Sequence, residues 1–388
     1  MKYFDYAATT HLHKEAAAVY LSTAQHQFGN TTSLHDAGGM AQNVLEQCRK
    51  KLAAILGVHP EGLYFTSGGT ESNSLALISL AQAHLHKGNH IILTAAEHPS
   101  LHSAAAYLSE QGFQITTIPF NADGIIDLRA LESSISERTI VVSVQHCNPE
   151  IGTIQPIRAI HEIVRPKGIL LHSDCVQSFG KLNVQDITPY VDSLSVSSHK
   201  IYGPKGVGAL YINPRLRAVP LFPGTVQEKG FRGGTVNVPG IAAFLIAAQL
   251  ADETANLAHY QKLRTIFLDA LLPHKEYFTF FGSDQAAEQL PHIIGLRVNH
   301  SEGQLIMLEL NRRGFAVSTG SACQVGQQQS STTMSAMQIP VHLSKGLVRI
   351  SFGQSSTRKT VQELADCLVE IAKEQNKNTL TAGDLIAK

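Results

Sequence analysis

The sequence has no excess of either charge, no long hydrophobic run and no paired-cysteine motif. Its 388 residues include 31 Lys and Arg and 31 Asp and Glu, so the formal net charge is zero. Dedicated nucleic-acid binders and polybasic membrane proteins need excess positive charge, and this balance argues against both classes. The most apolar stretches, such as 241–250, are far shorter than the roughly 20 residues of a membrane span. We therefore expect neither a nucleic-acid partner nor a membrane association.

Cysteines are few and scattered. The five of them, at positions 48, 147, 175, 323 and 367, form no CxxC pair, which is typical of reduced thiols rather than of a disulfide framework. The early acid Asp5 and the missing apolar region argue against a secretory signal. None of the 19 histidines belongs to an HExxH motif, and we predict no metal ion. These features indicate a cytoplasmic globular protein.

Short apolar runs alternate with helical patterns through the first part of the chain. Near-continuous Val, Ile and Leu runs separated by helices indicate an α/β fold, with a mainly parallel sheet covered on both faces. The expected strands span residues 64–66, 90–94, 114–119, 139–145, 169–173, 193–197 and 207–212. The expected helices span 71–87, 99–111 and 157–164, and Gly88 is expected to cap the first of them.

The chain is long enough for two domains. A long helical pattern at 239–270 leads into a second region of strand and helix signals. We predict a large domain over residues 1–255 and a smaller α+β domain over 256–375. Residues 1–15 are expected to pack on the small domain, and the polar residues 376–388 are expected to form a flexible tail.

Chemically informative side chains follow several of the predicted strands. In open sheets of this kind, ligands bind at the carboxyl ends of the strands. The residues at those ends are Thr70, His98, Asp174, Gln177, His199 and Lys200. Their types and positions therefore indicate what the site could do.

Each of these positions has an ordinary interpretation beside a chemical one. The turn at 67–71 could hold a phosphate on the amino terminus of a helix, or it could be a plain N-cap. It is neither a GxxxxGK[ST] nor a GxGxxG motif. Lys200 could be a solvated strand end or, if buried, an amine suited to a Schiff base. Asp174 could cap a helix or pair with a pyridinium nitrogen. His98 could be structural, or it could stack on a planar ring and move protons.

Segments along nearly the whole chain match one family in the right order. They are Tyr3–Thr10, Phe28–Asn30, Ser33–His35, Thr66–Asn73, Glu97–Pro99, Asp174–Gln177, Ser197–Gly206, Arg232–Asn237, Ser318–Cys323 and Val348–Ser351. On these motifs the sequence resembles the cysteine desulfurases (NifS- or IscS-like) of the class V aminotransferase family. The resemblance implies the type I fold of pyridoxal-phosphate enzymes and pyridoxal 5′-phosphate as cofactor.

The resemblance also implies roles for the matching residues. Lys200 would hold the cofactor as a Schiff base, and Asp174 would pair with its pyridine nitrogen. Gln177 would bond its phenolic oxygen, while His98 would stack on the ring and assist proton transfer. The implied ligands of the phosphate are Gly69, Thr70, Ser197, His199 and, from the other subunit of a homodimer, Thr235.

Substrate recognition and sulfur transfer follow from the same resemblance. Asn148 would contact cofactor and substrate, and Arg349 would pair with the carboxylate of L-cysteine. Cys323 would take the sulfur as a persulfide, leaving L-alanine, and would pass it to an acceptor or iron–sulfur scaffold protein, with a transient role as an iron–sulfur ligand also open. Pro149 stands where the family commonly has a second asparagine. Cys147 and Cys175 are expected to be small buried side chains.

Other functions remain open from the sequence alone. A selenocysteine lyase or another lyase or aminotransferase of the same fold would share most of these residues. A silent scaffold would not need Lys200, Asp174 and Cys323 together, and a simple nucleotide-phosphate binder would not explain Lys200 or Asp174. The sulfur acceptor is also open, since iron–sulfur assembly, activation of an NAD-synthesis enzyme and tRNA thiolation all fit.

Overall fold

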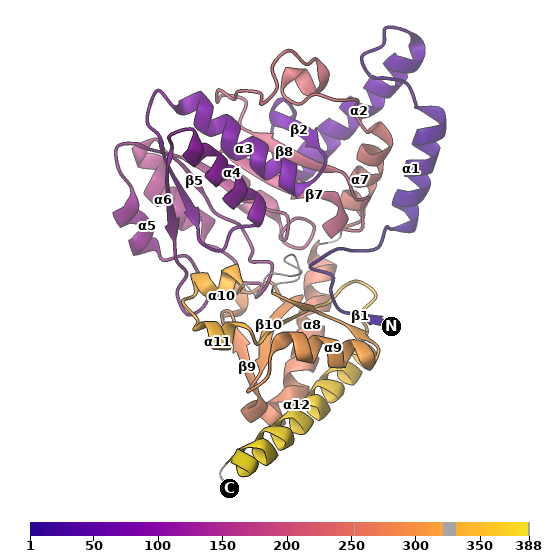
Figure 1. Cartoon of the computed structure of the whole chain (residues 1–388). Coiled ribbons are helices and arrows are strands. Elements are labelled where there is room, and N and C mark those ends of the chain that lie inside the picture. Colours follow the sequence, from indigo (N-terminus) through magenta and orange to yellow (C-terminus); the bar gives the residue numbers. More distant parts are fainter. Residues whose placement is uncertain (252, 321–330, 387–388) are drawn as a thin grey trace.

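The protein is built around a seven-stranded sheet, seen in a computed structural model that describes residues 1–251, 253–320 and 331–386 (Figure 1). Strand order is β2-β8-β7-β6-β5-β3-β4, and only β8 runs antiparallel to its neighbours. The strands are β2 (Leu63–Thr66), β3 (His90–Thr94), β4 (Gln114–Ile118), β5 (Thr139–Ser143), β6 (Leu170–Asp174), β7 (Ser193–Ser197) and β8 (Gly208–Ile212). The mainly parallel sheet predicted from the sequence is confirmed.

Helices cover both faces of this sheet because its strands bury side chains on both sides. Ile92 and Val142 pack in a core cluster with α2, α6 and α7, whereas Ile91 and Val141 pack in a cluster with α3 and α4. This two-sided burial explains the continuous apolar runs in the sequence. The helices of this layer are α1 (Lys14–His26), α2 (Asp36–Leu56), α3 (Gly69–His84), α4 (Pro99–Glu110), α5 (Leu128–Ser134), α6 (Ile157–Val164) and α7 (Val238–Leu250).

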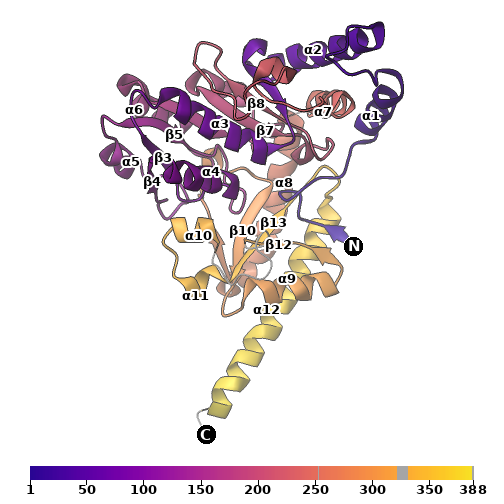
Figure 2. The same ribbon diagram turned by 45° about the horizontal axis from the view of Figure 1, so that its top comes forward.

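The later part of the chain forms a second, smaller sheet, which lies below the first one in Figure 2. It is antiparallel, with the order β12-β13-β10-β9, and Phe4, Phe267 and Phe352 help to fill its core. Its elements are α8 (Glu253–Leu271), β9 (Phe278–Phe281), β10 (Ile293–Val298), α9 (Gly303–Arg312), β11 (Phe315–Ala316), β12 (Ser318–Thr319), α10 (Thr332–Ala336), α11 (Val341–Ser344), β13 (Leu347–Ser351) and α12 (Arg358–Ile386). The first strand of the chain, β1 (Lys2–Tyr3), pairs with β11, so the amino-terminal segment contacts this part of the protein. The domain split at residue 256 stays a prediction.

Several element ends differ from the sequence-based expectations. Helix α3 ends at His84, so Gly88 does not cap it. Gly88 instead lies against the backbone of Arg138, where an added Cβ would be 2.2 Å from the carbonyl oxygen. The helical pattern at 239–270 is two helices, α7 and α8, and α12 continues to Ile386, past the expected start of the tail. Among the described residues, no helix is long and apolar enough to cross a membrane.

Candidate active site

Asp174 is held by a chain of buried polar side chains at the end of β6. Its Oδ2 accepts a hydrogen bond from Asn73 Nδ2 at 2.7 Å, and its Oδ1 accepts from the Val176 backbone N–H at 2.8 Å. Burial lowers the pKa of His172 to about 3, so this imidazole is neutral, and its Nε2 lies 3.4 Å from Asn73 Oδ1. The carboxylate is therefore fixed in place, with lone pairs still free for a cationic N–H donor.

His98 stands beside this carboxylate at the start of α4. Its Nδ1 lies 2.8 Å from Ser100 Oγ and accepts from the Ser100 backbone N–H at 3.2 Å. Ser100 Oγ in turn accepts from Asn73 Nδ2 at 3.1 Å. His98 and Asp174, which are 76 positions apart in the sequence, are thus linked through two intermediate side chains.

Lys200 meets the amino-terminal segment of the chain. It follows β7 in a short 3-10 turn, and its Nζ donates to the backbone oxygens of Ala7 at 2.5 Å and Ala8 at 2.8 Å. Gln177 Nε2 donates to the same Ala7 oxygen at 2.9 Å. Thr10 completes the contact, since its Oγ1 donates to the His199 oxygen at 2.9 Å. The first residues of the chain therefore form one wall of the site.

A pocket opens between the amino terminus of α3 and the end of β7. It is lined by Thr9, Ser67, Gly68, Gly69, Thr70, Glu71, Ser197, His199, Lys205 and Gly206. Gly68 has φ +149°, a backbone conformation that favours glycine, and a Cβ at Gly69 would come within 2.8 Å of Val176 Cγ2. The first N–H groups of a helix have no partner within the helix, so an amino terminus that lines a pocket, as Gly69 and Thr70 of α3 do here, suits an anion.

The electrostatics of the pocket are also suited to an anion. Burial, together with the nearby charges of Lys200, Lys181 and Lys205, lowers the pKa of His199 to about 4. His199 is therefore a neutral imidazole at pH 7, and its Nδ1 lies 3.1 Å from Thr9 Oγ1. The same lysine charges that disfavour a proton on His199 attract a phosphate dianion.

Arg349 and Asn148 lie at the boundary between the two sheets. Arg349 Nη2 pairs with Asp5 Oδ1 at 2.6 Å, and its Nη1 donates to the Pro149 backbone oxygen at 3.1 Å. Asn148 is fully buried, and its Nδ2 donates to Thr333 Oγ1 at 3.0 Å. Asn148 Oδ1 accepts from the Glu150 N–H at 2.9 Å and so closes the turn over residues 148–150. This bond does not use the backbone nitrogen of residue 149, so a proline fits there.

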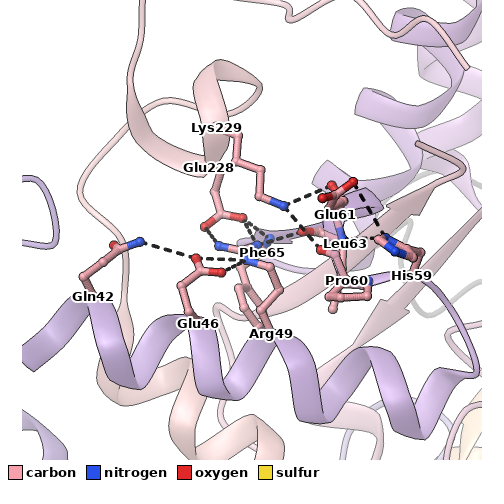
Figure 3. A network of polar contacts seen from close by, with 10 residues as sticks. All are labelled: Gln42, Glu46, Arg49, His59, Pro60, Glu61, Leu63, Phe65, Glu228 and Lys229. Atoms are coloured by element: carbon pink, nitrogen blue, oxygen red, sulfur yellow. Dashed lines mark hydrogen bonds and ion pairs between the residues drawn. The ribbon is translucent and has the colours of Figure 1, made fainter. Parts of the chain in front are cut away.

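The loop that carries Thr235 is anchored by a buried ion pair (Figure 3). Arg49 on α2 makes two 2.8 Å bonds to Glu228, and both side chains are almost fully buried. Further along, Arg232 pairs with Glu71 at 2.9 Å. Thr235 itself is exposed. It is not among the residues that line the pocket between α3 and β7 of its own chain.

The sequence-predicted cysteines fall into two groups. Cys147 and Cys175 are 2% and 0% exposed, which confirms the expected burial. Burial raises the pKa of the Cys175 thiol to about 12, so it stays protonated and unreactive at neutral pH. Cys323 lies outside the described residues.

Four functional contacts were not expected from the sequence. They involve Asp5, Thr10, Asn73 and Ser100. Asn73 lies one helical turn after Gly69, the first residue of α3, so the helical period offered a signal for it. Asp5 and Thr10 lie in the matching segment Tyr3–Thr10, but their partners could not be foreseen, because these lie about 190 to 344 positions away along the chain.

Comparison with known proteins places this geometry in a family. Residues 2–364 match the model of the family described as "Aminotransferase class-V". The chain is 46% identical over 366 residues to a protein of Bacillus subtilis (strain 168) named "Putative cysteine desulfurase NifS", covering 94% of this chain and 93% of that one. The chain belongs to the class V aminotransferase family, and within it to the NifS- and IscS-like proteins.

Solved structures agree with this placement. A structure titled "NIFS-LIKE PROTEIN" superposes with a TM-score of 0.88 at 31% identity, covering 96% of this chain and 99% of that one. A second, titled "SspA in complex with cysteine", gives a TM-score of 0.78 at 30% identity, with 91% and 99% covered. The type I fold of pyridoxal-phosphate enzymes is thereby confirmed.

The protein is a pyridoxal-phosphate-dependent enzyme, and its residues fit that cofactor. Among the described residues, Ser197 Oγ and Gln177 Oε1 are buried and have no hydrogen-bond partner. Buried polar atoms of this kind are costly unless a ligand or water satisfies them. Ser197 lines the glycine-walled pocket, and Gln177 lies beside Lys200 through the shared Ala7 oxygen. A group with a phosphate at one end and a polar ring at the other would satisfy both.

Proposed function

We propose that this enzyme is a cysteine desulfurase, which converts L-cysteine to L-alanine and keeps the sulfur on its own Cys323. The observation that carries the proposal is the 46% identity, over almost the full length of both chains, to a relative named as a cysteine desulfurase. The site geometry supports it, because Lys200 and Arg349 both bond the amino-terminal segment, through the Ala7 oxygen and the Asp5 carboxylate.

The reaction balances without an external oxidant. The Cys323 thiolate attacks the sulfur of L-cysteine, so that an S–S bond forms and the Cβ–S bond of the substrate breaks. The electron pair of that bond goes to carbon, which is reduced and gains a proton to become the methyl group of alanine. The transferred sulfur is oxidised to the sulfane level and remains on Cys323 as a persulfide.

Pyridoxal phosphate, when bound, supplies an electron sink that makes the α-proton of the substrate acidic. Lys200 would hold the cofactor covalently, and Asp174 would keep its ring nitrogen protonated. His98, linked to Asp174 through Ser100 and Asn73, would stack on the ring and assist proton transfer. Gln177, whose buried Oε1 has no partner among the described residues, would hydrogen-bond the phenolic oxygen.

Substrate binding is assigned to the residues between the two sheets. Arg349 would take the substrate carboxylate with the N–H groups not used by Asp5 and Pro149, and its Nε, buried and without a partner among the described residues, is available. Asn148 would contact substrate and cofactor from the neighbouring turn. Arginine suits this role because its planar fork matches a carboxylate.

The phosphate would be bound by the pocket at the end of β7. Its proposed ligands are Gly69, Thr70, Ser197 and His199 of one subunit and Thr235 of a second. A homodimer explains why Thr235 is exposed on a loop whose base is rigidly anchored by Arg49 and Glu228. Large exposed apolar side chains on nearby parts of the sequence, Phe222 and Val226, also favour a second copy as their cover.

The persulfide would be passed to an acceptor protein, with iron–sulfur cluster assembly in the cytoplasm as the proposed use. A scaffold protein for such clusters is the proposed partner, and Cys323 could then act as a transient cluster ligand. A pull-down of proteins that accept labelled sulfur from the loaded enzyme tests this part. No labelled acceptor in a bacterial extract would contradict it.

Product analysis tests the activity itself. With L-cysteine alone, the purified enzyme should form alanine and sulfane sulfur in equal amounts, with no keto acid required. Dependence on a keto acid would indicate an aminotransferase instead. Turnover of selenocysteine without turnover of cysteine would indicate a selenocysteine lyase.

A further inference from the structure

The carboxylate of Asp174 fixes which way the side chain of Asn73 faces. Asn73 is buried in α3, and its Nδ2 lies 2.7 Å from Asp174 Oδ2 and 3.1 Å from Ser100 Oγ. A carboxylate accepts hydrogen bonds and cannot donate them, so the amide must turn its NH2 group toward Asp174. The second hydrogen of that group then goes to Ser100, and the amide oxygen is left facing His172.

His172 agrees with this orientation. Burial lowers its pKa to about 3, so the ring is neutral and has one donor and one acceptor nitrogen. Its Nε2 lies 3.4 Å from the Asn73 oxygen and therefore donates. Its Nδ1 lies 2.7 Å from Ser193 Oγ and accepts the proton of that hydroxyl. Both ring nitrogens are thus satisfied only when Asn73 faces this way.

The same direction continues through Ser100 to His98. Because Ser100 Oγ accepts from Asn73, its own proton can point at His98 Nδ1, which lies 2.8 Å away. The Ser100 backbone N–H also reaches Nδ1, at 3.2 Å, and a backbone N–H can only donate. His98 Nδ1 therefore faces two donors, both from a residue that is 5% exposed.

The neutral His98 ring has one proton to place. Partial burial lowers the pKa of His98, while the charge of Asp174 opposes this shift and that of Lys200 adds to it. At pH 7 the ring is neutral and carries its proton on one nitrogen only. We propose that Asn73 and Ser100 are positioning residues, which pass the orientation set by Asp174 to His98 and hold its proton on Nε2.

The position of this proton defines what His98 can do. With Nδ1 occupied by two donors, the ring presents an N–H group at Nε2 to a bound molecule and no lone pair. His98 therefore assists the reaction as a hydrogen-bond donor and is not the base that removes the α-proton. This role rests on the proposed desulfurase function, whereas the position of the proton does not.

The test is nitrogen NMR of the holoenzyme with isotope-labelled histidine. The His98 signals are identified by their loss in His98→Ala. An acceptor nitrogen and an N–H nitrogen differ widely in chemical shift, so the shifts give the ratio of the two ring forms. In the wild type, Nε2 should carry the proton and Nδ1 should be an acceptor. A proton on Nδ1 would overturn the inference.

Asn73→Asp should reverse the direction with little change in size. An aspartate offers Ser100 an acceptor in place of an N–H, so the Ser100 hydroxyl turns toward it and accepts from His98 Nδ1. The ratio of the Nδ1–H form to the Nε2–H form should rise about tenfold or more, because the hydroxyl now stabilises the opposite form. In the Ser100→Ala background, Asn73→Asp should have no such effect, since the hydroxyl that transmits it is gone. An unchanged ratio in Asn73→Asp, or a change that survives Ser100→Ala, would contradict the proposed role of Ser100.

Thr139→Val is the matched control, because Thr139 Oγ1 lies 2.8 Å from Nδ1 of another histidine, His90. It should change the signals of His90 and leave those of His98 as they are. If Asn73→Asp does not fold, the wild-type spectrum decides, since it reports directly which nitrogen holds the proton. A wild-type enzyme that forms no alanine from L-cysteine would instead contradict the proposed function, and the proton on His98 Nε2 would stand.

Discussion

Removal of the Arg49 guanidinium should destabilise the protein more than a change at any surface ion pair. Arg49 makes two bonds to Glu228 and one to the Leu63 backbone oxygen at 2.7 Å, and only 2% of its side chain is exposed. Glu228 also accepts from the Phe65 backbone N–H at 2.7 Å. Arg49→Met leaves a buried carboxylate without its cation, at a cost of about 3–5 kcal/mol.

The assay is urea unfolding of the purified protein, followed by far-ultraviolet circular dichroism. A matched control is Arg158→Met, since Arg158 pairs with Glu162 at 3.2 Å but both side chains are mostly exposed, and such a pair is worth about 0.3–0.5 kcal/mol. The double variant Arg49→Met with Glu228→Gln should lose less than the sum of the single changes, because each single change already breaks the pair.

Loss of the ion pair between Arg49 and Glu228 should also change the conformation of the loop that contains Glu228. Glu228 and Lys229 have φ values of +44° and +58°, a conformation that non-glycine residues adopt only when their surroundings impose it. A free energy of unfolding for Arg49→Met within about 1 kcal/mol of the wild type would refute this reasoning, since breaking a buried pair cannot be that mild.

Three further predictions concern single residues. Lys200→Ala should abolish alanine formation and leave the cofactor removable by dialysis, as followed by its visible absorbance; full turnover would contradict the assignment. Arg349→Ala should raise the KM for cysteine about tenfold or more, because a charge-assisted carboxylate contact is worth about 1.5–3 kcal/mol, and an unchanged KM would remove Arg349 from the site. Burial raises the pKa of Glu97 from 4.5 to about 8, so the stability of the wild type should fall as the pH rises from 4.5 through 8. Glu97→Gln, whose oxygen can still accept from Thr94 and Gln145, should show a flatter profile in unfolding experiments across this range, and an equally steep one would contradict the pKa.

The strands were predictable because their burial leaves a direct trace in the sequence. Strands β3 and β7 have the predicted bounds, since every residue in each is buried. The start of α3 was placed two residues late, because Gly69 and Thr70 are poor helix formers that the surrounding structure holds in the first turn. Local propensity could not reveal that constraint.

The sequence predicted which residues of the candidate site follow the strands, but not which side chains contact one another there. The motif around Asp174 placed it at the end of β6, as found. The sequence could not show that Asn73 and His172 hold this carboxylate, because side-chain direction across a helix–sheet interface depends on packing. The pairing of Arg349 with Asp5 likewise needs the amino-terminal segment to lie against β13, a contact between the two ends of the chain.

The central claim is that Cys323 accepts the sulfur of L-cysteine. The most direct measurement is mass analysis of the cysteines after one turnover with sulfur-labelled L-cysteine. Label should appear on Cys323 of the wild type, while Cys323→Ser should keep its cofactor absorbance, carry no label and form no persulfide. Cys147→Ala and Cys175→Ala serve as controls and should keep the label, because those thiols are buried and protonated. Alanine and persulfide formed by Cys323→Ser at the wild-type rate would contradict the account.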